Sequence, residues 1–171
     1  TYLSSCIVYA PSSAKHASGS HGNFHLRLET IILTGDEESY SSITSFDAKP
    51  FKNLGRFDIF NYAITSLDLT YSNNLWNVEV NNCRDFSAIK TASNSDYVVY
   101  MINLPKLTDM SKCEFKNAKG IEFKLTGIQD IDVSNYGNLE WLNVAGNYNE
   151  DGSEMQVYEL NSINVAGCDI L

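Results

Sequence analysis

A short apolar pattern recurs along most of this chain. An apolar residue is followed by two variable residues, a second apolar residue, one variable residue and a third apolar residue. The clearest copies are Ile64-Leu67-Leu69, Leu75-Val78-Val80, Ile128-Ile131-Val133 and Leu139-Leu142-Val144. Weaker copies fill the intervals, so that copies begin at residues 43, 54, 64, 75, 86, 97, 107, 118, 128 and 139. The steps are 10 or 11 residues, and two copies therefore make a repeat of 21 or 22 residues.

The last residues of each copy alternate between apolar and polar side chains, as in a half-buried β-strand. Val78 and Val80 would lie on one face of a strand and Asn77, Glu79 and Asn81 on the other. One coil cannot bury its own apolar face, but stacked coils bury it against their neighbours. The alternative is a β-sandwich, whose strands keep no such register over more than a hundred residues. The pattern therefore predicts a β-rich solenoid with a parallel sheet and little helix.

The repeats predict the domain limits. An upstream copy, Leu28-Ile31-Leu33, precedes a polar insertion at 35–39. The last copy, Leu160-Ile163-Val165, begins 21 residues after Leu139, and we expect it on the same sheet as that copy. We predict a solenoid over residues 28–171. Residues 1–27 lie outside the register, and their Ser/Gly-rich part suits a flexible segment, whereas residues 1–10 suit a strand that caps the first coil.

The residue three places after the last apolar position of a copy points to a resemblance to a known family. Cys83, Asn147 and Cys168 occupy this position. The segments resemble leucine-rich repeats, whose signature is LxxLxLxxN/C, and in particular the 21-residue bacterial subclass with LxxLxL in both halves. Tyr62, Pro105 and Thr126 depart from the signature and argue against a continuous asparagine ladder. The resemblance implies a curved solenoid that binds a protein, or sometimes a glycan, in secreted or cell-surface proteins of bacteria.

Charge and hydropathy narrow the choice of partner. The chain of 171 residues carries a formal charge of −9, which argues against nonspecific binding of nucleic acid or of anionic membranes. No apolar run reaches the roughly 18 residues of a membrane span. No signal-peptide pattern opens the sequence, so we expect a processed or trimmed form. LSSC at 3–6 resembles a lipoprotein cleavage box, but the residues before Cys6 argue against its use.

The cysteines and histidines give weak indications of chemistry. We expect Cys83 and Cys168 to be small buried residues and Cys113 to point outward, with a Cys6–Cys113 bridge left open. His16, His21 and His25 lie in a Ser/Gly-rich segment and suit a loop better than a metal site. No nucleophile elbow or phosphate loop is present, so we predict no catalytic residues and no enzyme activity.

One acidic segment has the spacing of a calcium loop. Asn147, Asn149, Asp151 and Gly152 match its positions 1, 3, 5 and 6, which converge oxygens on a hard cation. Position 1 lacks charge, and position 12 is Tyr158 rather than Glu. An acidic loop is the favoured interpretation, with calcium as the alternative and no other cofactor expected.

The exposed face of the repeat sheet is the candidate binding surface, because rigid strands hold side chains at fixed spacing. Phe60, Val99, Met101 and Trp141 are expected on this face, where apolar side chains favour a covering partner. We predict a noncatalytic protein-binding module. Trp141 beside Asn143 also suits a sugar ring. A structural subunit of a cell-surface assembly, or a face packed against a further domain, is compatible with the same residues. The candidate partner-binding residues are Asp58, Phe60, Asn77, Glu79, Val99, Met101, Glu122, Trp141 and Asn143.

Overall fold

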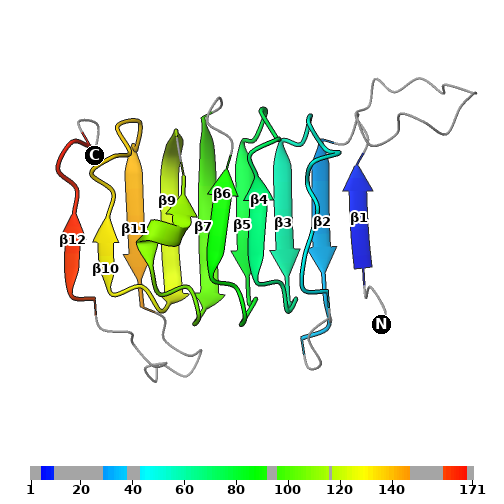
Figure 1. Ribbon diagram of the computed structural model, residues 1–171, viewed down its shortest axis with the longest axis horizontal. Helices are drawn as coiled ribbons and strands as arrows, with labels where there is room; N and C mark the ends of the chain where they lie inside the picture. The colour runs from blue at the N-terminus through cyan, green and yellow to red at the C-terminus, as the bar shows by residue number, and fades with distance from the viewer. Residues whose placement is uncertain are drawn as a thin grey trace, which may run out of the picture.

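The chain forms a β-solenoid of about five turns with about 22 residues in each turn. The computed structural model describes residues 29–37, 43–91, 96–115, 117–146 and 160–168, and the backbone of 5–9. Figure 1 shows the strands side by side along the long axis, coloured from blue at β1 to red at β12. The elements are β1 (Ser5–Tyr9), β2 (Thr30–Thr34), β3 (Arg56–Phe60), β4 (Ser66–Leu69), β5 (Asn77–Asn81), β6 (Ala88–Thr91), β7 (Tyr97–Leu104), the 3-10 turn η2 (Met110–Lys112), β8 (Cys113–Glu114), β9 (Ala118–Thr126), β10 (Asp130–Asp132), β11 (Trp141–Ala145) and β12 (Ser162–Asn164).

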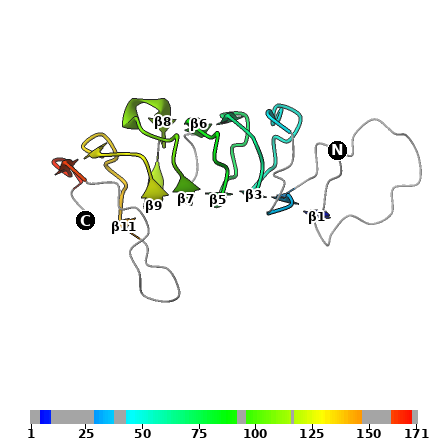
Figure 2. The same ribbon diagram turned by 90° about the horizontal axis from the view of Figure 1, so that it is seen from below.

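The strands form two layers, visible in Figure 2 as β3, β5, β7 and β9 below β6 and β8. One layer is a seven-stranded sheet in the order β1-β2-β3-β5-β7-β9-β11, and the other holds β4-β6-β8 and β10-β12. All pairs are parallel except β1 with β2. The predicted fold class is confirmed. β1 adds an antiparallel strand at the first coil, and a capping role for residues 1–27 as a whole stays a prediction.

The apolar pattern fills the space between the layers. Leu67 and Leu69 point inward from the smaller layer, Val78 and Val80 point inward from the larger one, and all four are buried. The polar residues that alternate with them point to the outer side of each layer. Asp68 and Asp132 stay exposed and accept backbone N–H bonds from the residues two places on, forming turns that end their strands.

Asparagines form a ladder at the corner where the seven-stranded sheet ends. Asn61, Asn82 and Asn103 all have positive φ, a conformation in which asparagine is strongly enriched. The Asn82 amide donates to Asn61 Oδ1 at 2.7 Å, the Asn103 amide donates to Asn82 Oδ1 at 2.7 Å, and the Asn61 amide reaches the Gly35 carbonyl at 3.3 Å. The expectation against a continuous ladder fails for these coils, because the ladder residues stand one or two places before the N/C position of the signature.

The prediction that Val99 and Met101 point outward from β7 is wrong. Val99 pairs with Val78, and Met101 pairs with Val80, so both point into the core and are fully buried. Tyr100 takes the outward position. The prediction slipped by one residue because apolar residues follow one another in YVVYMI, so alternation does not mark the inner face.

The prediction that Cys113 points outward is wrong, because a short 3-10 turn precedes it. Residues Met110–Lys112 form the turn η2, and Cys113 then pairs with Ile89 and is buried. Its thiol is free, which excludes the Cys6–Cys113 bridge. The turn η2 occupies the positions where a constant step predicts the strand, so the strand and its inward residue Cys113 come later than predicted.

The final strand lies in the other layer from the one predicted. Ile163 of β12 pairs with Ile131 of β10, not with β11 of the seven-stranded sheet. Both halves of the repeat carry the same apolar pattern, so spacing alone does not decide which layer a terminal copy joins. In the described part of the chain, no helix combines the length and the apolar character needed to cross a bilayer.

Candidate functional site

The outer face of the seven-stranded sheet brings side chains from every coil into rows. Direct cross-strand partners form the central row, which reads Ile32, Asp58, Glu79, Tyr100, Glu122 and Asn143. Of the predicted residues, Phe60, Glu79, Glu122 and Trp141 are half-buried on this face, and Asn143 is exposed. Asp58 is fully buried and Asn77 nearly so, which corrects the expectation that they contact a partner directly.

Asp58 instead holds its neighbours in place. One of its carboxylate oxygens accepts from Arg56 Nε at 2.6 Å and from Arg56 Nη2 at 2.6 Å, and the other accepts from Asn77 Nδ2 at 2.9 Å. A buried carboxylate needs such charge-assisted partners. The guanidinium of Arg56 is therefore fixed in direction while 36% of its side chain stays exposed.

Trp76 lies beside this arginine. Trp76 is 52% exposed, and the Arg56 guanidinium carbon lies 5.8 Å from the centroid of its ring. A Cβ on Gly55, one coil earlier, would lie 2.6 Å from Trp76 Nε1. The indole thus occupies the space that any side chain at residue 55 would need. We name Gly55, Arg56, Asp58, Trp76 and Asn77 the Arg56–Trp76 patch.

The second tryptophan is seated in the same way. A Cβ on Gly120 would lie 2.0 Å from Trp141 Cε2, so the indole lies across β9. It reaches toward Tyr100 of β7, with the ring centroids 6.1 Å apart and the planes at 43°. Beside the rings, Asn143 Nδ2 donates to Glu122 Oε2 at 2.9 Å. We name Tyr100, Gly120, Glu122, Trp141 and Asn143 the Tyr100–Trp141 patch.

Glu79 separates the two patches on the central row. Burial raises the pKa of its carboxyl above the usual range, and the neighbouring Asp58 carboxylate acts in the same direction. The bond from Asn81 Nδ2, at 3.2 Å, opposes this shift by stabilising the charged form. The middle of the face therefore carries a carboxyl group that is partly withdrawn from water.

A hollow of about 570 Å³ borders the face over the asparagine ladder. Phe60, Asn81 and Ile102 line it from the strand ends, and Asn61, Asn82 and Asn103 line it from the corner. It is open and is lined by asparagine amides together with apolar side chains, so it extends the exposed surface without forming an enclosed cavity.

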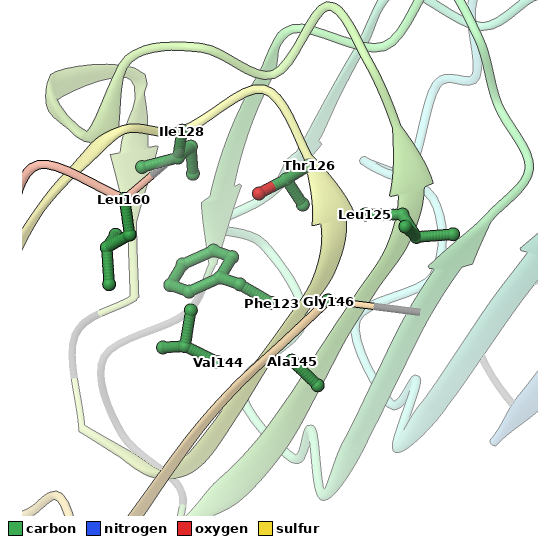
Figure 3. Close-up of a pocket in the computed structure, with 8 residues that line it drawn as sticks. All are labelled: Phe123, Leu125, Thr126, Ile128, Val144, Ala145, Gly146 and Leu160. Carbon is green, nitrogen blue, oxygen red and sulfur yellow. The ribbon is translucent and has the colours of Figure 1, made fainter. Parts of the chain in front are cut away.

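A second hollow, of about 150 Å³, marks the C-terminal end. Figure 3 shows the Phe123 ring between Leu160 and Val144, with Leu125 pointing away. Val144, Leu160, Ile163 and Val165 are between 36% and 47% exposed, although equivalent residues of earlier coils are buried. None of the described residues that line this hollow is titratable.

The buried cysteines have no reactive character. Cys83 is fully buried as predicted, whereas Cys168 is only partly buried. Burial raises the pKa of the Cys83 thiol to about 11 and that of Cys113 to about 12. Thiolate is the nucleophilic form, so neither group is activated near neutral pH.

These shifts predict a loss of stability at alkaline pH. In the unfolded chain both thiols ionise near their ordinary pKa of 9.0, whereas the folded chain keeps them protonated to about pH 11. The unfolded state then binds fewer protons, and the free energy of unfolding should fall above pH 9 by on the order of 1 kcal/mol per pH unit for each thiol. Urea titrations at several pH values under reducing conditions measure this slope. Cys83→Ala should make the slope shallower, and an unchanged slope would contradict the assignment.

The predicted site residues did not include Arg56 and Tyr100 on the face, nor Trp76, which directly precedes β5 and lies beside Arg56. The sequence does contain a sign of where the two tryptophans lie. Gly55 and Gly120 each precede a tryptophan by 21 residues, which is one turn of the solenoid. Gly120 and Trp141 are cross-strand partners in β9 and β11, whereas Gly55 and Trp76 directly precede β3 and β5. In both pairs the indole occupies the space beside a glycine one turn earlier.

The predicted calcium loop at Asn147, Asn149 and Asp151 lies outside the described residues, as do His16, His21 and His25. Within the described ranges, no three His, Cys, Asp or Glu side chains gather as a metal site would require. The calcium alternative stays a prediction.

Comparison with protein-family models, with curated proteins and with solved structures finds no match. The architecture therefore stands on the chain's own geometry, which is that of a β-solenoid with parallel sheets and turns of about 22 residues.

Proposed function

We propose that this protein is a noncatalytic binding module that recognises a protein partner through the outer face of its seven-stranded sheet. The Arg56–Trp76 patch would form the centre of the contact. The observation that carries the proposal is a half-exposed indole beside an arginine that a buried carboxylate holds in one direction. Tryptophan and arginine dominate the binding energy of protein interfaces, and side chains fixed in advance lose little entropy on binding.

The surroundings of the patch suit a protein surface. Phe60 and Glu79 add a half-buried aromatic ring and a carboxyl group on the same face. The polar groups bond to one another, as in Arg56 with Asp58 and Asn81 with Glu79, which supports recognition rather than catalysis. We further propose that the chain is a leucine-rich repeat protein of the 21-residue bacterial subclass, and that it acts outside the cell or at its surface. The LxxLxL copies and Cys83 at the N/C position support this.

The test is partner capture by the immobilised protein from an extract of the source cells, with quantification by mass spectrometry. A protein captured by the wild type should be lost with Trp76→Ala and with Arg56→Ala. Gly55→Ala should have the same effect, because its Cβ would displace the indole. Gly137→Ala is the matched control, since its Cβ meets nothing within 4 Å.

The captured protein is then purified and its Kd measured against each variant. Loss of the indole should weaken binding about thirtyfold or more, as expected of a central interface residue. If every captured protein binds Trp76→Ala, Arg56→Ala and the wild type equally, the proposal is wrong.

A further inference from the structure

We propose that the Tyr100–Trp141 patch is a binding site for an uncharged sugar chain. It lies on the same face as the Arg56–Trp76 patch but on the later coils, and it shares no residue with that patch. The proposal is therefore independent of protein recognition at Trp76.

The aromatic rings supply the apolar part of the site. The Trp141 indole occupies the space that Gly120 leaves free, and the Tyr100 ring lies at 43° to it with the centroids 6.1 Å apart. That spacing is too small to admit a sugar ring between the two aromatic rings, so they form one bent platform. The C–H faces of sugar rings can pack on such a surface, burying apolar area in the way aromatic side chains favour.

The polar groups beside the platform suit hydroxyl groups. The bond from Asn143 to Glu122 uses one amide hydrogen and one carboxylate oxygen. The amide oxygen, the second amide hydrogen and the other carboxylate oxygen give donors and acceptors side by side. Neighbouring hydroxyls of a sugar need this combination, because each hydroxyl both donates and accepts.

Charge selects against acidic sugars. Tyr100 has Glu79 and Glu122 as its direct neighbours on the central row, and the whole chain carries −9. Lys124, on the adjacent row, is the cross-strand partner of Ile102 and Ala145, away from the rings. The carboxylates at the platform would repel the negative charge of uronic or sialic acid residues, whereas uncharged sugars would not be repelled.

The experiment uses Trp141 as its own reporter. The chain has two tryptophans, so Trp76→Phe leaves the indole at 141 as the single tryptophan fluorophore. This variant is titrated with uncharged oligosaccharides, namely cello-, manno-, xylo- and laminari-hexaose, and with acidic polygalacturonate. We expect a saturable fluorescence change with at least one uncharged chain and none with polygalacturonate.

Variants then separate the contacts. Asn143→Ala and Glu122→Gln should weaken binding at least about fivefold without affecting folding, since Asn143 is exposed and the Glu122 change keeps the side-chain shape. Gly120→Ala should abolish binding while keeping both rings, because its Cβ would push the indole away. Gly137→Ala should bind as before.

The outcomes are distinct from those of the protein proposal. Absence of a saturable change with every uncharged chain up to about 10 mM, a limit that weak sugar sites reach, would overturn the sugar site. So would equal affinity of Gly120→Ala, or preference for polygalacturonate. A captured protein that requires Trp141 and Tyr100 would instead make this patch part of a protein interface. Loss of partner capture with Trp76→Ala is unaffected by any of these results.

Discussion

Replacing Phe57 with alanine should lower the free energy of unfolding by about 3–5 kcal/mol, the usual range for a phenylalanine removed from a core. Phe57 is fully buried in β3, and its ring packs against Phe46 with centroids 4.9 Å apart. Its neighbours in register are Ile31 and Val78, so the cavity would open between three consecutive coils. Coils in a solenoid contact only their neighbours, which leaves the loss uncompensated elsewhere.

Urea unfolding followed by circular dichroism measures this effect. Phe46→Ala is the matched control, because it removes the other ring of the pair from a half-buried position. We expect a smaller loss for Phe46→Ala than for Phe57→Ala. Equal losses would show that the aromatic contact, and not burial between the sheets, decides the stability here.

Replacing Asn82 with alanine should lower the free energy of unfolding by about 2–5 kcal/mol. The change removes the amide bonds to Asn61 and from Asn103, each contributing about 0.5–1.5 kcal/mol. It also forces alanine into a left-handed conformation at φ 53°, which adds roughly 1–2 kcal/mol.

A second variant separates these two causes. Asn82→Gly loses the same amide bonds but adopts positive φ without strain, so its loss should be about 1 kcal/mol smaller in a parallel urea titration. If Asn82→Gly is as unstable as Asn82→Ala, the backbone conformation contributes nothing and the ladder accounts for the whole effect.

The fold was predictable because its rule is local and repeated. The apolar positions at 64, 67 and 69 and at 75, 78 and 80 define one coil, and a constant step extends it along the chain. The prediction failed where the local rule is ambiguous. In β7 both faces carry apolar residues, and before β8 the turn η2 takes the place of the expected strand, so Val99, Met101 and Cys113 were placed on the wrong side.

The candidate site was less predictable, because its contacts join different coils. That Asp58 is buried beneath Arg56 and Asn77 follows from the pairing of β3 with β5 and not from any local pattern. The seating of Trp141 requires knowledge that Gly120 is its cross-strand partner. Once the turn length is known, such partners can be found by comparing residues about one turn apart, as the two Gly-to-Trp intervals of 21 show.

Among the described coils, the one that contains β11 and β12 has the most exposed apolar residues. Inner coils are covered on both sides, whereas Val144, Ile163 and Val165 stay in contact with water. Stability in a stacked array is approximately a sum over neighbouring interfaces, so the coil with the fewest covered residues opens at the lowest free energy. Among the described strands, β11 and β12 should accordingly open before β3 and β5, which hydrogen exchange of the backbone amides would show as lower protection.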